Sequence, residues 1–372
     1  MMKNLILIVA LTQSICYGKD KSISNINPIL NITDSIQELP HIFFDGNDTL
    51  IRWINHGSLQ ELSSAKSTDF AHATKKLAIS LNLPIVEALE SSKSYPSTDY
   101  TFHNIDHWLA ISDIHGQYSL FVDLLQRHGV IDSANNWIFG KAHLIINGDI
   151  FDRGTGVTEA LWLVYKLQQQ AQSAGGKVHY LMGNHELMVL DNDVRYVHTK
   201  YQGIAKILGK TYEEQFGRES FFGQWIRKQP ITIKINDTWF VHAGISPAII
   251  QENLHPAQIN ALFRDSIFVQ KRADYRANPV LNLLATSNGP LWYRGYFKDD
   301  LVQSADITNI LQHWNAKNMV IGHTSQKEIT PLFNNQVLVI DSSIKNGKNG
   351  EVLIYNNGQL FRGLLDGQQI AL

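Results

Sequence analysis

Five short apolar runs recur along the chain, and each leads into polar residues that can bind a metal or carry a proton. The runs cover residues 108–112, 143–147, 178–182, 238–242 and 319–323. Helical spacing of apolar residues follows the first two runs, over 116–128 and 157–171. Short apolar runs bounded by turns are typical of buried strands, and strands that alternate with helices form parallel sheets. The pattern therefore predicts an α/β fold.

The segment before these runs has a different character. Residues 41–44 and 49–54 predict two strands joined by a turn, and residues 70–81 predict a helix. Residues 91–99, which include Pro96, have the composition of a linker. Because the apolar residues of this segment must be shielded from water, we expect residues 19–104 to form an extension that packs on the core. A partner-recognition element is the alternative.

Two polar insertions, residues 191–229 and 251–288, follow the third and fourth runs and are predicted to wall the crevice at the strand ends. The end of the chain holds three further short apolar runs, which predict a second, more antiparallel sheet. These runs are residues 336–340, 351–355 and 359–362. The catalytic domain is predicted to span residues 105–372.

The amino terminus has the features of a cleaved signal peptide. Lys3 precedes a short apolar core, and small residues lead to Gly18 ahead of a charged pair. The apolar core is too short to span a bilayer, so we expect no membrane span. A signal peptide over residues 1–18 implies a periplasmic or secreted protein.

Charge and cysteine content exclude two further classes. The chain of 372 residues has a formal net charge of −2, without the basic surplus expected of a protein that neutralises a nucleic-acid backbone. We therefore expect no nucleic-acid partner. The single cysteine, Cys16, lies inside the predicted signal peptide. A mature chain without a thiolate has no cysteine nucleophile.

The residues that follow the apolar runs suit a pair of divalent metal ions. In α/β sheets, ligands bind outside the carboxyl ends of the strands, so these side chains should meet in one crevice. Aspartate, asparagine and histidine offer hard and borderline donors. The strand-end candidates are Asp113, His115, Asp149, Asn184, His242 and His323.

Five motifs in fixed order carry a resemblance to a known family. They are the segments 112–116 (SDIHG), 148–154 (GDIFDRG), 183–186 (GNHE), 242–244 (HAG) and 322–323 (GH). This series of motifs resembles that of the calcineurin-like metallophosphoesterases, in particular their phosphoprotein phosphatase branch. With the leader and the segment LWYRGY at 291–296, it looks most like the Shewanella-like protein phosphatases, of the bacterial cold-active protein-tyrosine phosphatase type. The resemblance spans residues 105–364 and implies a four-layer α/β/β/α sandwich.

The resemblance implies a dinuclear metal centre with a hydroxide that bridges the two ions. Asp149 would be shared by both ions. Asp113 and His115 would complete one site, and Asn184, His242 and His323 would complete the other. Mixed ligands of this kind accept Mn, Fe, Zn or Co. Ser112 stands where the family usually has glycine, which leaves the ligands intact.

The resemblance also implies roles around the metals. His185 would be the general acid and Asp152 would orient it. Arg153 and Arg294 would bind the phosphoryl group, with Asn184 contributing to the same contact. The implied activity is hydrolysis of phosphate monoesters, in phosphorylated proteins at tyrosine or at serine and threonine.

Other interpretations stay open from the residues alone. The same site suits a broad phosphatase, or a hydrolase of nucleotides or dinucleoside polyphosphates, and a non-catalytic metal- and phosphate-binding module is a third class. Taken singly, Asp152 or Arg153 is more often part of an ordinary turn. Residues 203–211 look like a P-loop, but five residues separate the glycines, and the spacing predicts a helix that ends at Gly209.

Overall fold

The computed structural model describes residues 36–91, 98–298 and 301–372. The predicted signal peptide, residues 1–18, and most of the predicted linker lie outside these ranges. No helix within the described ranges is long and apolar enough to cross a bilayer.

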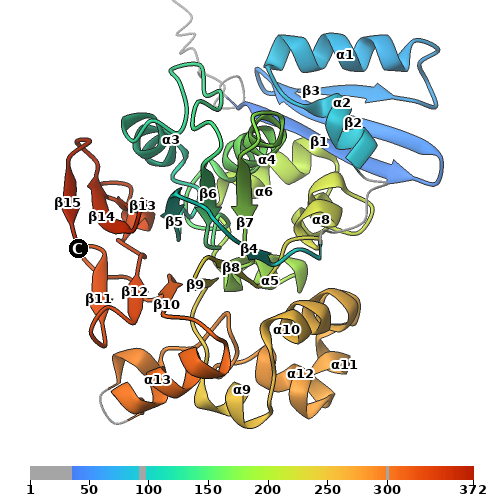
Figure 1. Ribbon diagram of the computed structural model, residues 1–372. Coiled ribbons are helices and arrows are strands. Elements are labelled where there is room, and N and C mark those ends of the chain that lie inside the picture. Colours follow the sequence, from blue (N-terminus) through green and yellow to red (C-terminus); the bar gives the residue numbers. More distant parts are fainter. Residues whose placement is uncertain (1–35, 92–97, 299–300) are drawn as a thin grey trace, which may run out of the picture.

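Six strands form the first sheet, in the order β15-β14-β13-β5-β6-β7 (Figure 1). The first three apolar runs form its parallel half. The remaining three strands are antiparallel to their neighbours. The strands are β5 (His107–Ile111), β6 (His143–Ile146), β7 (Lys177–Tyr180), β13 (Glu351–Asn356), β14 (Gln359–Leu364) and β15 (Gln369–Ala371). The three motif strands are therefore adjacent, and their carboxyl ends lie at one edge.

The second sheet also has six strands, in the order β11-β12-β10-β9-β8-β4. Its centre is parallel, because β10 lies between β9 and β12 in the same direction. The strands are β4 (Thr101–Phe102), β8 (Thr232–Ile235), β9 (Thr238–Val241), β10 (Asn318–Ile321), β11 (Thr330–Leu332) and β12 (Val337–Val339). The fourth and fifth apolar runs thus form neighbouring strands of a sheet separate from the first three.

The expectation that the three late runs form one antiparallel sheet is wrong. β13 and β14 extend the first sheet, with Ile354 opposite Leu109. β12 instead joins the second sheet, with Leu338 opposite Val320. Strand propensity is local, but the pairing partner depends on which sheet edge is open in the folded chain.

Side chains that alternate along the motif strands explain the layered architecture. Trp108 and Ala110 face an apolar layer between the two sheets, where the ring of Trp108 lies 5.1 Å from that of Phe240. Leu109 and Ile111 face the opposite way, towards the helices. Each sheet is covered on its outer side, by α3 (Tyr118–Arg127) and α4 (Val157–Ser173) on one and by α9 (Pro247–Gln251) and α13 (Ser304–His313) on the other (Figure 1). The predicted four-layer α/β/β/α sandwich is confirmed.

Both predicted insertions are helical, and they meet. The first follows α5 (Asn184–Leu190) and holds α6 (Lys200–Leu208), α7 (Tyr212–Gln215) and α8 (Phe221–Ile226). The second holds α10 (Pro256–Leu262), the π-helical turn η2 (Phe263–Ile267), α11 (Arg272–Ala277) and α12 (Pro279–Leu284). The hydroxyl of Tyr275 donates to Asp191, which links the two insertions. Gly209 ends α6 in the left-handed conformation, so the P-loop-like segment is a helix as predicted.

The residues before β4 form a separate three-stranded antiparallel sheet with two helices (Figure 1). The strands are β1 (Glu38–Asp45), β2 (Asp48–Asn55) and β3 (Ser58–Ser63), and the helices are α1 (Phe70–Leu81) and α2 (Ile85–Ser91). The predicted hairpin and helix are confirmed, whereas β3 was not predicted, because four of its six residues are polar and all six are half-buried or exposed. Phe44 N–H donates to the carbonyl of Glu219, and the indole of Trp162 donates to that of Pro40. These bonds dock the sheet on α4 and α8.

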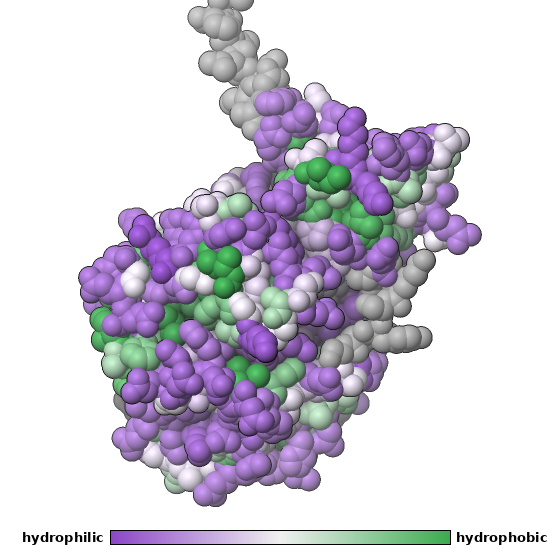
Figure 2. All heavy atoms as spheres, turned by 45° about the horizontal axis from the view of Figure 1, so that its top comes forward, coloured by the Kyte–Doolittle hydropathy of each residue, from purple (hydrophilic) through white to green (hydrophobic). Residues whose placement is uncertain are grey.

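The surface seen from the side of this extension is mainly hydrophilic, with hydrophobic residues in a few small patches (Figure 2). Ile79 of α1 is among the exposed large hydrophobic residues. Short one-turn helices complete the secondary structure, at η3 (Gly295–Phe297) and η4 (Ile344–Asn346).

Candidate dinuclear metal centre

The loops at the strand ends have an unusual backbone. Six predicted site residues have positive φ angles between 47° and 72°, a region that costs a side-chain-bearing residue energy. They are Asp113, His115, Asp149, Asp152, Arg153 and His323. Strain of this kind persists only where surrounding bonds enforce it, and it is common at functional sites.

Asp149 lies at the centre of the cluster. Its Oδ2 lies 3.3 Å from Nε2 of His242 and 3.6 Å from Nε2 of His115. Its Oδ1 accepts the backbone N–H of His185 at 3.0 Å. One carboxylate oxygen is therefore fixed by the start of α5, while the other faces histidines from both sheets.

Glu186 holds the loop that carries Asp149. One carboxylate oxygen of Glu186 accepts the N–H groups of Asp149 and Gly183, at 2.9 and 2.8 Å. The other accepts the N–H of Ile150 and the hydroxyl of Tyr180, at 2.8 and 2.9 Å. Four donors converge on one fully buried carboxylate, which joins motifs two and three.

The histidines on either side of Asp149 are oriented for binding through Nε2. Nδ1–H of His115 donates to the carbonyl of Phe151 at 2.7 Å, and Nδ1–H of His242 donates to that of Asn147 at 2.8 Å. A backbone carbonyl on one ring nitrogen is the usual way to fix a metal-binding imidazole. Burial lowers the pKa of His115 to about 3, which keeps its ring neutral and able to bind a cation.

The second group combines residues from motifs three, four and five. Asp149, His242 and His323 lie close enough together to hold one ion. Oδ1 of Asn184 lies 3.1 Å from Nε2 of His242, on the same side. Nε2 of His323 is buried and has no hydrogen-bond partner among the described residues. An orphaned, buried imidazole nitrogen beside a carboxylate suits a metal ion.

Asp113 occupies the far side of the cluster. Its Oδ2 accepts the Ser112 hydroxyl at 2.6 Å and the N–H of His323 at 2.9 Å, and its Oδ1 lies 3.9 Å from Nε2 of His115. Ser112, where the family has glycine, therefore supports this carboxylate. Burial, the charge of Asp341 and that of Asp149 raise the pKa of Asp113 well above its usual value. Like charges at such close range favour a site that binds cations.

The two groups share Asp149, but the first differs in one member from the predicted set. His115, Asp149 and His185 meet within ion-binding distance, whereas Asp113 is not part of this group. His185 differs from the other two oriented rings in its Nδ1 partner, which is the carboxylate of Asp152 at 2.5 Å instead of a carbonyl. Burial favours a neutral ring, but Asp149 and Asp152 raise the pKa of His185 above its usual value. A ring that keeps its proton suits an acid better than a ligand.

Two exposed arginines flank the cluster. The guanidinium of Arg153 lies 5.1 Å from the ring centre of Tyr196, and its backbone N–H donates to the Tyr196 carbonyl at 2.9 Å. Arg294 donates to the hydroxyl of Thr324 at 3.2 Å, next to His323. The ten predicted site residues thus surround one centre, with cations available for an anionic group.

Comparisons with known proteins agree with this geometry. The family described as calcineurin-like phosphoesterase matches residues 107–327. The chain belongs to the calcineurin-like phosphoesterase family. Its activity class is hydrolysis of phosphate esters by a metal-dependent enzyme.

Individual relatives of this phosphoesterase have similar folds and sequences. The crystal structure of the cold-active protein-tyrosine phosphatase of a psychrophile, Shewanella sp., superposes with a TM-score of 0.78 at 37% identity, over 91% of this chain and 100% of that one. Shewanella-like protein phosphatase 1 of Plasmodium berghei is 27% identical over 73% of this chain and 76% of its own length. A symmetrical bis(5'-nucleosyl)-tetraphosphatase of Janthinobacterium sp. is 26% identical over 53% of this chain and 60% of its own length.

Sequence reasoning missed one buried carboxylate of the phosphoesterase site, that of Asp341. Glu186, the last residue of the third motif, is predicted from the sequence to have a structural role, and its four accepted hydrogen bonds agree with that. Asp341 follows the apolar run of β12, so the same strand-end rule could have found it. It is fully buried, and it accepts the Ser325 hydroxyl at 2.5 Å and the N–H of Ser343 at 3.0 Å.

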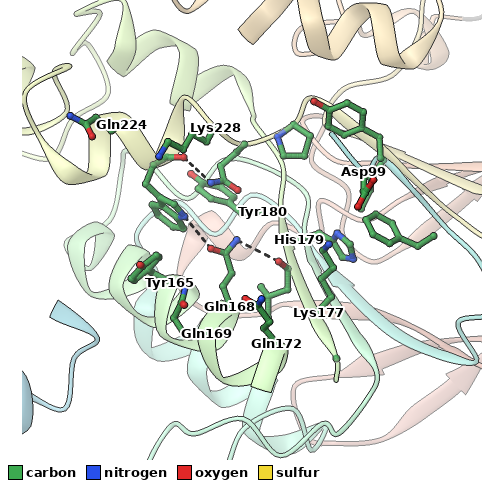
Figure 3. A pocket seen from close by; sticks show the side chains of 18 of the residues that line it. Asp99, Tyr165, Gln168, Gln169, Gln172, Lys177, His179, Tyr180, Gln224 and Lys228 are labelled. Atoms are coloured by element: carbon green, nitrogen blue, oxygen red, sulfur yellow. Dashed lines mark hydrogen bonds between the residues drawn. The ribbon is translucent and has the colours of Figure 1, made fainter. Parts of the chain in front are cut away.

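A separate cavity of about 610 Å³ lies beside β7 and α8 of the phosphoesterase (Figure 3). Gln168 spans its wall, where it accepts the indole N–H of Trp225 and donates to the carbonyl of Val178. None of the ten predicted site residues lines this cavity. This cavity is therefore separate from the carboxylate–histidine cluster.

Proposed function

We propose that this chain is a metal-dependent phosphoprotein phosphatase that removes phosphate from tyrosine, or from serine and threonine. The observation that carries the proposal is the position of Oδ2 of Asp149 between histidines of both sheets, beside a proton-bearing His185–Asp152 pair. The names of the Shewanella and Plasmodium relatives support protein substrates.

The residues divide into a metal set and a substrate set. Asp149 would be shared by two divalent ions, with Asp113 and His115 on one side and Asn184, His242 and His323 on the other. When bound, such a pair supplies Lewis-acid stabilisation of the phosphoryl oxygens and an acidified water as the nucleophile. The mixed donor set suits Mn, Fe, Zn or Co.

The chain's own groups bind the phosphoryl group and manage the proton. Arg153 and Arg294 would contact phosphoryl oxygens, with the Asn184 amide contributing a donor. His185 would donate the proton from Nε2 to the leaving oxygen, which becomes a hydroxyl. Asp152 would hold Nδ1–H and stabilise the charged ring.

The direct test is hydrolysis of p-nitrophenyl phosphate by the full chain, stripped of metal and then supplied with Mn, Fe, Zn or Co. We expect activity to vanish on stripping and to return with at least one metal. Asp149→Asn should abolish turnover and weaken metal uptake, whereas Asp132→Asn, at a turn outside the cluster, should change neither. Normal turnover by Asp149→Asn would overturn the two-metal proposal.

A nucleotide substrate is the competing assignment, favoured by the similarity to the tetraphosphatase of Janthinobacterium. Competition between phosphopeptides and dinucleoside tetraphosphates for one enzyme separates the two. Our proposal requires a higher kcat/KM for phosphopeptides. A higher value for the nucleotide would replace it.

We also propose that the protein is periplasmic or secreted, on the basis of the signal-peptide pattern in residues 1–18. Amino-terminal sequencing of the protein from its native cells should find the mature chain beginning close to Lys19. A chain that retains residues 1–18 in the cytoplasmic fraction would contradict this.

A further inference from the structure

Tyr196 is an exposed aromatic residue beside the predicted proton donor. Its ring centre lies 5.4 Å from that of His185, and the residue is 44% exposed. Buried aromatic residues pack the core, but an exposed ring beside a reactive site is available to a ligand. The ring of Tyr196 therefore lies where a substrate bound beside His185 could contact it.

The surroundings of Tyr196 fix its place. Its carbonyl accepts the N–H of Arg153, and the guanidinium groups of Arg153 and Arg195 lie 5.1 and 5.6 Å from its ring centre. Arg195 is held in turn by two bonds to the carboxylate of Asp193, at 2.7 and 2.8 Å. The ring is thus set between a phosphate-binding arginine and the acid before any substrate arrives.

The loop that carries Tyr196 is also tied to the second insertion. Asp191 accepts the hydroxyl of Tyr275, and Arg272 lies 3.5 Å from Asp193. These contacts hold the residues ahead of Tyr196, and the bond from the Arg153 N–H holds Tyr196 itself, so the loop forms a fixed wall. A wall held in this way can select among substrates at low entropic cost.

The chemistry places one part of the substrate next to this wall. His185 must deliver its proton to the leaving oxygen, so the group attached to that oxygen lies on the His185 side of the phosphoryl group. Tyr196 places an exposed ring beside His185. Aromatic pairs in edge-to-face or offset contact gain energy beyond the area that they bury.

We propose that Tyr196 contacts the leaving group and favours aromatic over alkyl phosphate esters. The proposal rests on the phosphatase function above, and it assigns the preference for one substrate class to one side chain. A phosphorylated phenol would place its ring against Tyr196, whereas an alkyl ester such as phosphoserine would leave this ring in water.

The test uses the full, metal-loaded chain and one peptide sequence that carries either phosphotyrosine or phosphoserine. Tyr196→Ala should lower kcat/KM for phosphotyrosine by about 3- to 10-fold, the range expected for one aromatic contact. For phosphoserine it should change less than about twofold, and Tyr196→Phe should resemble the wild type. Val194→Ala is the matched control, because Val194 lies in the same loop and is also 44% exposed.

A second readout separates this role from support of Arg153. If Tyr196 only positions Arg153, Tyr196→Ala will lower both activities equally and weaken inhibition by inorganic phosphate. That result would overturn the proposal, and unchanged phosphate inhibition with a loss confined to phosphotyrosine would support it. If the wild type hydrolyses small esters but neither peptide, protein substrates are excluded. The effect of Tyr196→Ala on an aromatic ester relative to an alkyl ester is then measured with phenyl phosphate and glycerol phosphate.

Discussion

Nδ1 of His185 and Oδ2 of Asp152 lie 2.5 Å apart, and both side chains are buried beside Asp149. The pair joins the second and third motifs, since Asp152 follows β6 and His185 lies in the first turn of α5. A charge-assisted bond of this length fixes the ring and keeps its proton. Mutation of either residue of this pair should therefore affect mainly the proton-transfer step.

Replacement of His185 should affect substrates according to their leaving group. We expect His185→Gln to lower kcat for phosphoserine or phosphotyrosine by about 100-fold or more, because these alcohols leave poorly without a proton. Nitrophenolate leaves without that help, so the loss on p-nitrophenyl phosphate should be much smaller. Steady-state kinetics measures kcat for both kinds of substrate. Equal losses of kcat on both would argue against a role of His185 as the acid.

The pH dependence should reflect the raised pKa of His185. The charged ring is the active acid, so turnover of alkyl phosphates should fall as the pH rises through this pKa, which lies above the ordinary value of about 6.5. Asp152→Asn removes a carboxylate that raises the pKa of His185, so the alkaline fall in turnover should move to lower pH. A pH profile of kcat that does not move would contradict the pairing.

Glu186 should be needed for the metal site although it binds no metal. In Glu186→Gln, one accepting oxygen becomes an NH₂ group, which leaves two of the four donors without an acceptor. We expect the unfolding free energy to fall by at least about 2 kcal/mol and metal affinity to fall about 10- to 100-fold. Denaturant unfolding and metal titration measure the two effects. Glu252→Gln, on an exposed side chain, should show neither.

Gly183 should not tolerate a side chain. A Cβ there would lie 2.2 Å from Oδ1 of Asp149 and 2.6 Å from its backbone nitrogen. We expect Gly183→Ala to displace the carboxylate and reduce kcat at least about 100-fold. Gly203→Ala is the control, because nothing lies within 4 Å of its added Cβ and alanine stabilises helix α6 by up to about 1 kcal/mol. An active Gly183→Ala enzyme would show that Asp149 can move without loss.

Tyr201 should contribute to stability through its hydroxyl. That hydroxyl accepts the N–H of Val157 at 2.8 Å and donates to the carbonyl of Thr155 at 2.9 Å, just after the second motif. Tyr201→Phe leaves a buried N–H unpaired, so we expect a loss of about 1–3 kcal/mol in unfolding free energy. Tyr355→Phe, on a half-buried ring, should cost less. Denaturant unfolding measures the loss. An unchanged unfolding midpoint in Tyr201→Phe would mean that water replaces the hydroxyl.

Features that depend on local spacing could be predicted from the amino-acid sequence. Apolar runs predicted the motif strands, and the residues at their ends predicted the members of the cluster. Parallel neighbours bring their carboxyl ends to one edge, so the sequence was sufficient to place Asp113, Asp149 and Asn184 together. The helix over residues 200–208 was likewise fixed by apolar spacing and a terminal glycine.

The way in which the two sheets meet could not be predicted, because it depends on contacts between distant residues. The resemblance implied that His242 and His323 join Asp149, but that they do so from a second sheet, across the apolar layer between the sheets, is not described by any local pattern. The same holds for the late strands, which divide between both sheets. The place of Tyr196 also depends on distant residues, because the two insertions are joined through Tyr275 and Asp191. Strand pairing and burial depend on the whole folded chain. They bring together side chains that the sequence alone could identify as candidates.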